Sequence, residues 1–281
     1  LPIGHTNVYA LADLDQSGYP DLVCTSKNDM RIFNGGPKGL DPSQYYDLPE
    51  RSPGLYNVLI GDLNRDGWLD LVGIPMSLDY KPETLAHSSV IYYGSPDGFT
   101  RENIQPLPTS CRGAGILADV NHDGWIDIIC PDIRGYLGIF LGGPSGYSPD
   151  NILKIPMEGI DVTFVPAVTC ADLNGDGWLD IIVTFMGHYT RERSGFFILY
   201  GNSEGYSTDR MEFHPTDASS ILISAADLNN NGHLDLLVPA YSTQFSRVLP
   251  AHIYWGDGET FDFENPLSIP CDASCAFMAI D

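Results

Sequence analysis

The sequence contains little positive charge. It has 14 Lys and Arg residues against 37 Asp and Glu residues, which gives a formal net charge of −23. A surface of this sign repels nucleic-acid phosphates, so nucleic acid is excluded as a partner. No apolar run is long enough to cross a bilayer, and no membrane span is expected. Because hydrophobic residues make up 43% of the chain, a disordered chain is also excluded.

Several other patterns are missing. No segment keeps a 3.6-residue apolar period, which argues against helical and α/β folds. The six cysteines lack zinc-site spacing, and they permit disulfides without requiring them. Cys24 and Cys130 occupy equivalent strand positions and are expected to be buried free thiols. Cys271 and Cys275 lie close together in a connector and are the expected local pair. Since no Ser stands in an elbow motif, a Ser/His/Asp triad is not predicted.

The sequence does contain a nine-residue acidic motif that occurs five times. The copies occupy residues 13–21, 62–70, 119–127, 172–180 and 227–235. Each has oxygen-bearing side chains at positions 1, 3, 5 and 9 and Gly at position 6, and an apolar run follows at once. Repetition at an interval of about 50 residues indicates an array of supersecondary units.

The spacing of oxygens in the motif suits a hard divalent cation. Ca²⁺ takes six to eight oxygen ligands, and alternate residues of a tight turn can supply them. The Gly allows a sharp turn, and position 7 is expected to contribute its backbone carbonyl. The predicted ligands are Asp13, Asp15, Ser17, Tyr19, Asp21; Asp62, Asn64, Asp66, Trp68, Asp70; Asp119, Asn121, Asp123, Trp125, Asp127; Asp172, Asn174, Asp176, Trp178, Asp180; and Asp227, Asn229, Asn231, His233, Asp235.

Up to five Ca²⁺ sites are therefore predicted, and they are not equal. The fifth copy has only two carboxylates and is expected to bind most weakly, while the first copy has Ser17 at position 5. Mg²⁺ suits the loops less well because it demands a stricter octahedron. Ordinary Asp/Asn/Gly turns are the alternative, which five copies in one register disfavour. An EF-hand is excluded because position 12 is never acidic, as Cys24 and Gly73 show.

A short apolar strand is predicted on each side of every motif, as Val58–Gly61 and Leu71–Gly73 illustrate. Farther on, each repeat has an aromatic-glycine pattern such as Ile139–Gly146 followed by Tyr147. This pattern predicts a third strand, a Gly-containing turn and an aromatic residue that opens a fourth strand. Four strands in about 50 residues are typical of a propeller blade, so the predicted fold class is an all-β propeller of four-stranded antiparallel blades.

The loop and the aromatic-glycine pattern together resemble the FG-GAP/VCBS-type repeat, a calcium-binding β-propeller repeat also found in integrin α subunits. The resemblance covers essentially the whole chain. It implies an architecture more than an activity, because such propellers serve adhesion, sugar binding and, in some polysaccharide lyases, catalysis. Ser17 and the fifth loop depart from the family pattern.

A single propeller domain is predicted over residues 1–281. Its five complete blades are expected at about 7–56, 57–112, 113–165, 166–220 and 221–270, with 271–281 as the start of a further blade. We therefore expect a piece of a ring of six to eight blades, with seven as the first expectation from the family resemblance. A five-bladed ring with the extra strand packed elsewhere is the alternative.

The connectors expected on the face opposite the acidic loops collect most of the basic residues. Nine of the 14 lie there: Lys27, Arg31, Arg51, Lys81, Arg112, Arg134, Arg191, Arg193 and Arg247. An anionic partner such as an acidic polysaccharide would suit that face, although any exposed loop collects charge. Three connectors are enlarged, and long loops on a rigid scaffold carry recognition. Their predicted ligand-binding residues are Tyr80, Lys81, His87, Arg193, Tyr241 and Arg247.

Three functions remain open on the sequence. The first is a secreted or cell-surface, calcium-stabilised binding or adhesion module for a glycan or an extracellular protein, since such sites fit the millimolar Ca²⁺ outside cells. The second is a polysaccharide lyase, in which His188 or Tyr189 would remove a proton beside a uronate carboxylate that Arg191 neutralises. The third is a structural segment of a large surface protein.

Overall fold

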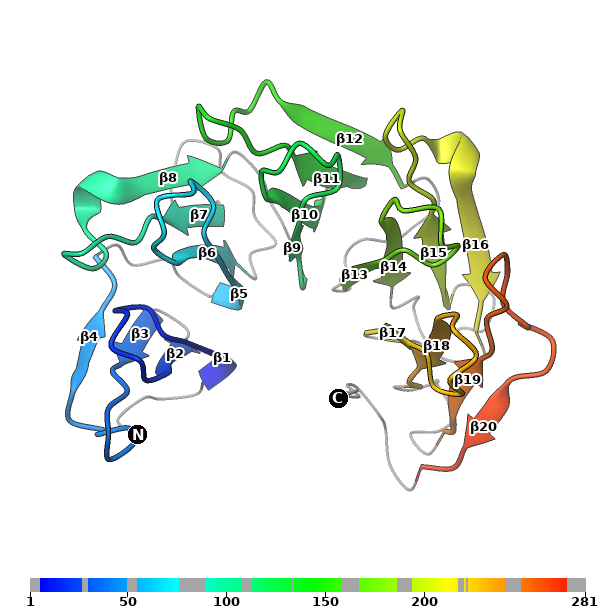
Figure 1. The fold of residues 1–281 in the computed structure, drawn as a ribbon, viewed down its shortest axis with the longest axis horizontal. Coiled ribbons are helices and arrows are strands. Elements are labelled where there is room, and N and C mark those ends of the chain that lie inside the picture. The colour runs from blue at the N-terminus through cyan, green and yellow to red at the C-terminus, as the bar shows by residue number, and fades with distance from the viewer. Residues whose placement is uncertain are drawn as a thin grey trace. The chain divides into compact units, whose positions relative to one another are not determined.

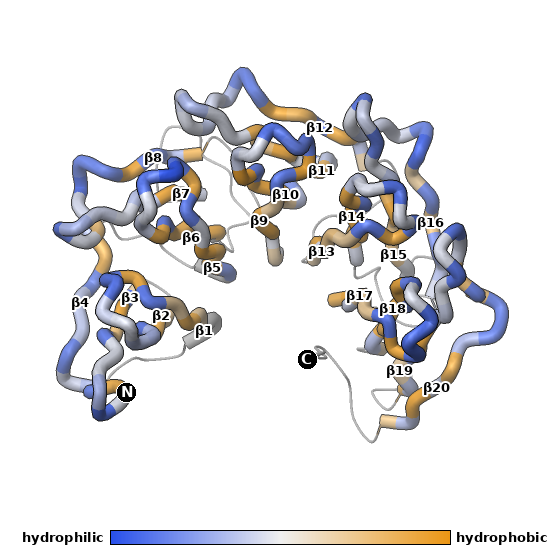
Figure 2. Tube along the Cα trace, viewed as in Figure 1, coloured by the Kyte–Doolittle hydropathy of each residue, from blue (hydrophilic) through white to orange (hydrophobic). Residues whose placement is uncertain are grey.

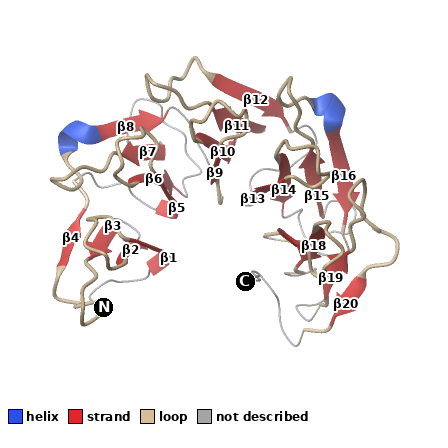
Figure 3. Cartoon of the chain, viewed as in Figure 1, coloured by secondary structure: helices blue, strands red, loops and turns tan. Residues whose placement is uncertain are grey.

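The chain folds into antiparallel β-sheets (Figure 1). The computed structural model describes residues 6–26, 30–49, 55–75, 89–107, 113–132, 134–157, 167–185, 194–216, 220, 222–240 and 249–271. These residues form five four-stranded sheets. The described part contains no α-helix; its only helical elements are two single 3₁₀ turns, η2 (Arg101–Asn103) and η4 (Thr208–Arg210), shown in Figure 3.

Each sheet is a meander in which consecutive strands are neighbours. The strands of the first sheet are β1 (Thr6–Ala12), β2 (Asp21–Ser26), β3 (Met30–Phe33) and β4 (Tyr45–Asp47). Those of the second are β5 (Leu55–Gly61), β6 (Asp70–Pro75), β7 (Ser89–Tyr92) and β8 (Ile104–Leu107). Those of the third are β9 (Ile116–Ala118), β10 (Asp127–Asp132), β11 (Tyr136–Phe140) and β12 (Ile152–Pro156).

The remaining two sheets repeat this order. The fourth consists of β13 (Val168–Ala171), β14 (Asp180–Phe185), β15 (Gly195–Leu199) and β16 (Met211–Pro215). The fifth consists of β17 (Ser224–Ala226), β18 (Asp235–Val238), β19 (Ala251–Tyr254) and β20 (Leu267–Ile269). The predicted all-β fold of four-stranded antiparallel units is confirmed. The blade limits and the closure of the sheets into a ring stay predictions.

The chain divides into two compact units, residues 1–154 and 155–281. In the first unit, the middle strands of the second sheet are buried on both faces because successive side chains point to opposite sides. Leu71 belongs to the same buried cluster as Ile32 of the first sheet. Its neighbour Val72 belongs to a cluster with Ile128 of the third sheet. The middle strands of the second sheet, β6 and β7, contain hydrophobic segments, coloured orange in Figure 2.

In the second unit, the fourth and fifth sheets share a core rich in aromatic rings. It includes Phe196, which is fully buried, together with Phe263. His214 of β16 lies between them, with its ring stacked on Phe263 at a centroid distance of 4.0 Å and tilted against Phe196 at 5.3 Å. Burial lowers the pKa of His214 to about 4 because the imidazolium form would lose its hydration. Glu212 Oε2 lies 3.6 Å from Nε2, beyond hydrogen-bonding distance.

One prediction for the cysteines is confirmed and two are wrong. Cys24 is buried and free, as expected. Cys130, which is also buried, is disulfide-bonded, so the prediction of a free thiol there is wrong. Cys271 is free, with its thiol 3.6 Å from the carbonyl oxygen of Ile269, and the predicted local pair with Cys275 is therefore wrong. Spacing in the sequence does not show which cysteines the strands bring together.

In the four repeats that have an aromatic residue after the pattern glycine, that residue does not open the fourth strand as predicted. Tyr147 precedes the first residue of β12, Ile152, by a short loop, and it is buried. Its hydroxyl donates to the carbonyl of Ile126 at 2.6 Å. Tyr206 donates to the carbonyl of Leu179 at 2.7 Å in the same way. Both tyrosine hydroxyls are thus directed back to the acidic motif, because both carbonyls belong to motif position 8.

Among the described residues, no helix is long and apolar enough to span a membrane.

We predict that His214 makes the folded state weaker in mild acid. Its pKa is below the ordinary value in the folded chain, so the unfolded chain binds a proton first as the pH falls. The contribution of neutral His214 to the free energy of unfolding is complete above about pH 6.5. It falls by about 1–3 kcal/mol as the pH drops from about 6.5 to 4. Urea unfolding of His214→Phe, compared with the unsubstituted chain at pH 7.5, 6 and 5, measures this. Parallel pH profiles for the two proteins would contradict the prediction.

Candidate metal centres

Every acidic motif forms the hairpin that joins the first and second strands of a sheet. Its position-9 Asp is the first residue of the second strand and pairs with the last residue of the first strand. Asp70 pairs with Gly61 in the second sheet, and Asp127 pairs with Ala118 in the third. The five loops therefore occupy equivalent places in the five sheets, because the strand register is the same in each.

The position-9 carboxylates are buried and accept two backbone hydrogen bonds each. In the second loop, Leu63 N–H donates to Asp70 Oδ2 at 2.7 Å and Gly94 N–H donates to Oδ1 at 2.8 Å. The same pair of bonds recurs in the other four loops. Burial raises the pKa of Asp70, Asp127 and Asp180 to about 6, against the lowering effect of these bonds. Burial likewise raises the pKa of Asp21.

The second donor in each pair is the glycine of the aromatic-glycine pattern. A Cβ on Gly142 would overlap the carbonyl oxygen of Ile126 and come within 3.1 Å of the Trp125 side chain. The same carbonyl accepts the Tyr147 hydroxyl. A side chain at this glycine would therefore push the third strand away from the loop. The glycines that occupy this place are Gly35, Gly94, Gly142, Gly201 and Gly256.

Positions 1 and 3 orient the loop backbone. In the second loop, Asp66 N–H donates to Asp62 Oδ1 at 3.2 Å and to Asn64 Oδ1 at 3.0 Å, and Gly67 N–H donates to Asp62 Oδ2 at 3.0 Å. The backbone is left-handed at position 6, where Gly67 has a φ of 88°. Only glycine adopts that region without strain, which explains the glycine of the motif.

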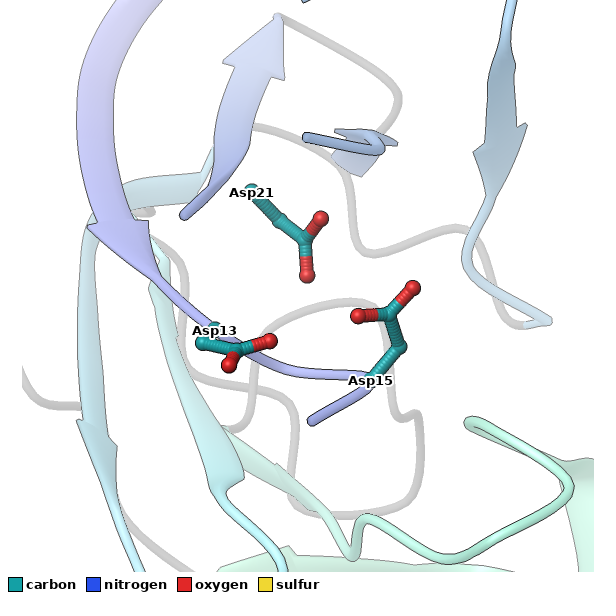
Figure 4. Close-up of side chains that lie close together, drawn as sticks. All are labelled: Asp13, Asp15 and Asp21. Carbon is teal, nitrogen blue, oxygen red and sulfur yellow. The ribbon is translucent and has the colours of Figure 1, made fainter. Parts of the chain in front are cut away.

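The carboxylates of the first loop converge on one point. Figure 4 shows Asp13, Asp15 and Asp21 directed toward one another, with one oxygen of each within 4.8 Å of the others. Among the described residues, no second set of three acidic side chains converges in this way. In the second loop, Asp66 is turned into the loop, accepting from Trp68 N–H at 2.8 Å and from the Asn64 amide at 2.9 Å.

The third and fourth loops have the same inward-turned carboxylates at position 5. In the fifth loop, the amide of Asn231 donates to the Gly256 carbonyl at 3.1 Å and its Oδ1 accepts from His233 N–H. The loops thus differ in whether their position-5 side chain faces the others. The full ligand sets, including the position-7 carbonyls, stay predictions.

One atom supports a cation in these loops independently of their acidity. Asp119 Oδ1, at position 1 of the third loop, is buried and has no hydrogen-bond partner among the described residues. A buried carboxylate oxygen without a donor is costly, and a divalent cation would satisfy it. The oxygen-only side chains of the loop are the donors that a hard cation prefers. The residues therefore fit a divalent cation.

Two features of the site were not predicted. The first is the hydrogen bond that the pattern glycine donates to the position-9 Asp. The sequence signal for this bond was that the two residues occur together in every repeat. The second is a left-handed backbone at position 4. Gln16, Arg65, His122 and Asn230 have φ values of 56°, 61°, 57° and 58°, which few non-glycine residues adopt. Nothing in the sequence marks position 4, because its residues are chemically unrelated.

The predicted ligand-binding residues and the catalytic candidates lie outside the described residues. They are Tyr80, Lys81, His87, His188, Tyr189, Arg191, Arg193, Tyr241 and Arg247. The same holds for Lys27, Arg51 and Arg112 of the predicted basic face. Its two described members are paired with acids: Arg31 lies on β3, not in a connector, and contacts Asp47 at 2.6 Å, while Arg134 contacts Asp132 at 2.6 Å. The described part of that face is therefore less basic than its composition suggested.

The glycine contact predicts a sharp difference between two adjacent residues. We expect Gly142→Ala to destabilise the chain by about 1–3 kcal/mol, because its Cβ meets the Ile126 carbonyl. Gly143→Ala is the matched control, since no atom lies within 4 Å of its Cβ position, and it should change stability by less than about 0.5 kcal/mol. Urea unfolding of both variants measures the difference. Equal effects would show that the close approach does not constrain this glycine.

Comparison with known proteins agrees with these repeats. Residues 13–73, 119–183 and 172–238 match the family model described as FG-GAP-like repeat. Integrin alpha pat-2 of Caenorhabditis elegans is 25% identical over 287 residues, covering 83% of this chain and 23% of that protein. Integrin alpha-7 of Mus musculus is 29% identical over 141 residues, covering 46% of this chain and 12% of that protein. The chain thus spans less than a quarter of the length of these relatives.

Two solved structures share the fold at low identity. A lectin of Agrocybe aegerita, described as recognising non-reducing terminal N-acetylglucosamine, aligns with a TM-score of 0.54 at 15% identity, over 95% of this chain and 66% of that one. BBS1N in complex with ARL6DN aligns with a TM-score of 0.54 at 10% identity, over 96% and 71%. Since the family model matches well over half of the chain, and the hairpin loops repeat in all five sheets, the chain belongs to the FG-GAP-like repeat family.

Proposed function

We propose that this chain is an extracellular binding module whose acidic hairpins hold Ca²⁺ and whose sheets present a surface to a glycan or a protein partner. The observation that carries the proposal is the convergence of Asp13, Asp15 and Asp21 on one point. The unsatisfied Asp119 Oδ1 supports it in the third loop. Two independent loops thus have carboxylate oxygens placed for a cation.

Ca²⁺ is the cation that suits these loops best. All predicted ligands are oxygens, and the number of carboxylates differs from loop to loop. Ca²⁺ accepts such variation in its oxygen ligands, whereas Mg²⁺ requires a stricter octahedron. Up to five ions are proposed, one for each loop. The fifth loop is the weakest because it has only two carboxylates, Asp227 and Asp235, and the Asn231 amide is engaged with the Gly256 carbonyl.

Cation binding also offsets a cost of the fold. In the second loop, Asp62 and Asp66 act electrostatically on the buried Asp70 and raise its pKa further. These like charges repel one another in the partly desolvated loop. A divalent cation replaces that repulsion with attraction, so we expect Ca²⁺ to stabilise the folded chain rather than to take part in a reaction.

A binding role rests on the relatives and on the kind of scaffold. The relatives named above are integrin alpha chains, which supports an adhesion or binding role at the cell surface. The two structures with a similar fold bind a sugar and a protein respectively, so both classes of partner remain in the proposal. No described residue favours the lyase, because its candidates His188, Tyr189 and Arg191 lie outside the described residues.

We predict that calcium raises the melting temperature. Millimolar Ca²⁺ at about 100 times its dissociation constant stabilises a site by about 2.7 kcal/mol, and the total over several loops should raise Tm by about 5–15 °C relative to EDTA. Asp13→Asn should reduce that gain. Asp209→Asn makes the same charge change at an exposed position outside the loops and should leave the gain unaltered. Equal melting in Ca²⁺ and EDTA would contradict the calcium sites.

The partner is tested by binding with and without calcium. The chain is applied to a glycan array and to extracellular protein fractions in Ca²⁺ and in EDTA, alongside an assay for unsaturated uronate absorbance on acidic polysaccharides. Retention of a glycan or protein in Ca²⁺ without new absorbance is the expected result. New absorbance that is lost in His188→Ala would instead assign the chain to the lyases. Absence of every signal would favour a structural role.

A further inference from the structure

The position-4 residue of each loop has an unusual backbone conformation, and this conformation sets the direction of its side chain. Positive φ values recur at this position in all five loops, and only the fourth loop has a glycine there, Gly175. Position 4 stands between positions 3 and 5, two of the predicted ligands. Any cation that fixes positions 3 and 5 therefore also fixes the direction of the position-4 side chain.

In the first loop, this side chain reaches the second loop. Gln16 Nε2 donates to the backbone carbonyl of Gly67 at 2.7 Å. Gly67 is position 6 of the second loop, and its own N–H donates to Asp62 Oδ2 at 3.0 Å. The next N–H, of Trp68, donates to Asp66 Oδ1 at 2.8 Å. Gln16 thus holds the peptide segment that orients two carboxylates of the neighbouring loop.

In the second loop, the equivalent residue reaches the third loop. The guanidinium of Arg65 lies over the Trp125 ring, 4.5 Å from its centroid, and adjoins Gly124, where it would collide with a Cβ. Gly124 N–H donates to Asp119 Oδ2 at 2.8 Å, and Trp125 N–H donates to Asp123 Oδ1 at 2.8 Å. A different side chain, in a different kind of contact, therefore holds the same two positions of the following loop. All three loops lie within residues 1–154.

We propose that Gln16 and Arg65 are positioning residues that couple each cation loop to the next, so that occupancy of the first loop raises the cation affinity of the second, and occupancy of the second raises that of the third. The inference rests on the proposed calcium sites. Binding orders positions 3 to 5 of one loop, and the ordered position-4 side chain then orders positions 6 and 7 of its neighbour. The second ion consequently meets a loop that has already lost part of its freedom. By linkage, the coupling is reciprocal.

The fifth loop supplies a matched comparison. Asn230 occupies position 4 with the same left-handed backbone, at φ 58°, and makes no side-chain hydrogen bond or ring contact within the described part of the chain. An Ala substitution there carries the same backbone strain as one at Gln16 or Arg65. It removes no described contact to another loop.

The experiment follows the loops one at a time in the 281-residue chain. The amide resonances of Gly18, Gly67, Gly124 and Gly232 report the four loops in ¹H–¹⁵N NMR spectra during a Ca²⁺ titration, because each N–H donates to a position-1 carboxylate. We expect Gln16→Ala to raise the calcium midpoint of Gly67 about threefold to tenfold, the range that loss of one hydrogen bond produces. Gly232 should keep its midpoint.

Further variants identify the cause. Gln16→Met keeps the length of the side chain without its donor and should behave like Gln16→Ala. Arg65→Ala should raise the midpoint of Gly124. Loss of its positive charge alone would lower that midpoint, so the direction separates positioning from electrostatics. Asn230→Ala should leave the midpoints of Gly18, Gly67 and Gly124 unchanged.

The outcomes distinguish this inference from the function on which it rests. If no glycine responds to Ca²⁺ in the unsubstituted chain, the calcium sites themselves are wrong, and the inference falls with them. If the glycines respond, but Gln16→Ala and Arg65→Ala leave Gly67 and Gly124 at their original midpoints, the calcium sites stand and the coupling is overturned. Equal shifts at all four glycines would also overturn it, because they would show a general loss of stability.

Discussion

A buried carboxylate that accepts two backbone N–H groups connects the parts of each sheet. One donor comes from the hairpin that precedes the second strand, and the other comes from the glycine that follows the third strand, as Leu63 and Gly94 do for Asp70. Burial of a charged group is costly unless its hydrogen bonds are made. Because the same two bonds recur in all five sheets, the loop, the strand register and the glycine cannot change independently.

Within one motif, position 9 has a structural role in addition to its predicted role as a cation ligand. Position 9 is buried and connects strands, whereas positions 3 and 5 lie at the exposed end of the hairpin. Their side chains are free to turn inward, as Asp66 does, or toward the other carboxylates, as Asp15 does. A cation that stabilises such a loop acts on the same carboxylates that hold the hairpin together, so binding and folding are connected.

The scaffold itself does not determine what the chain recognises. Folds of this kind host different functions, and function depends on residues that the fold presents rather than on the fold. The regular sheets place five equivalent loops, and position 4, occupied by residues such as Gln16, Arg65 and Asn230, has chemically unrelated side chains in different loops. Variation at position 4 therefore changes which contact a loop makes with the next one without changing the sheets.

The sequence by itself determined the repeat, the four-stranded units, the family and the places of the acidic loops, because these depend on local spacing and on the alternation of apolar residues. Tertiary structure decided what depends on contacts between distant residues. It placed Tyr147 against Ile126 rather than at the start of β12, and left Cys271 free while Cys130 is disulfide-bonded. It also brought Gln16 to Gly67, 51 residues away. Such pairs follow from how strands and loops pack, which residue spacing does not record.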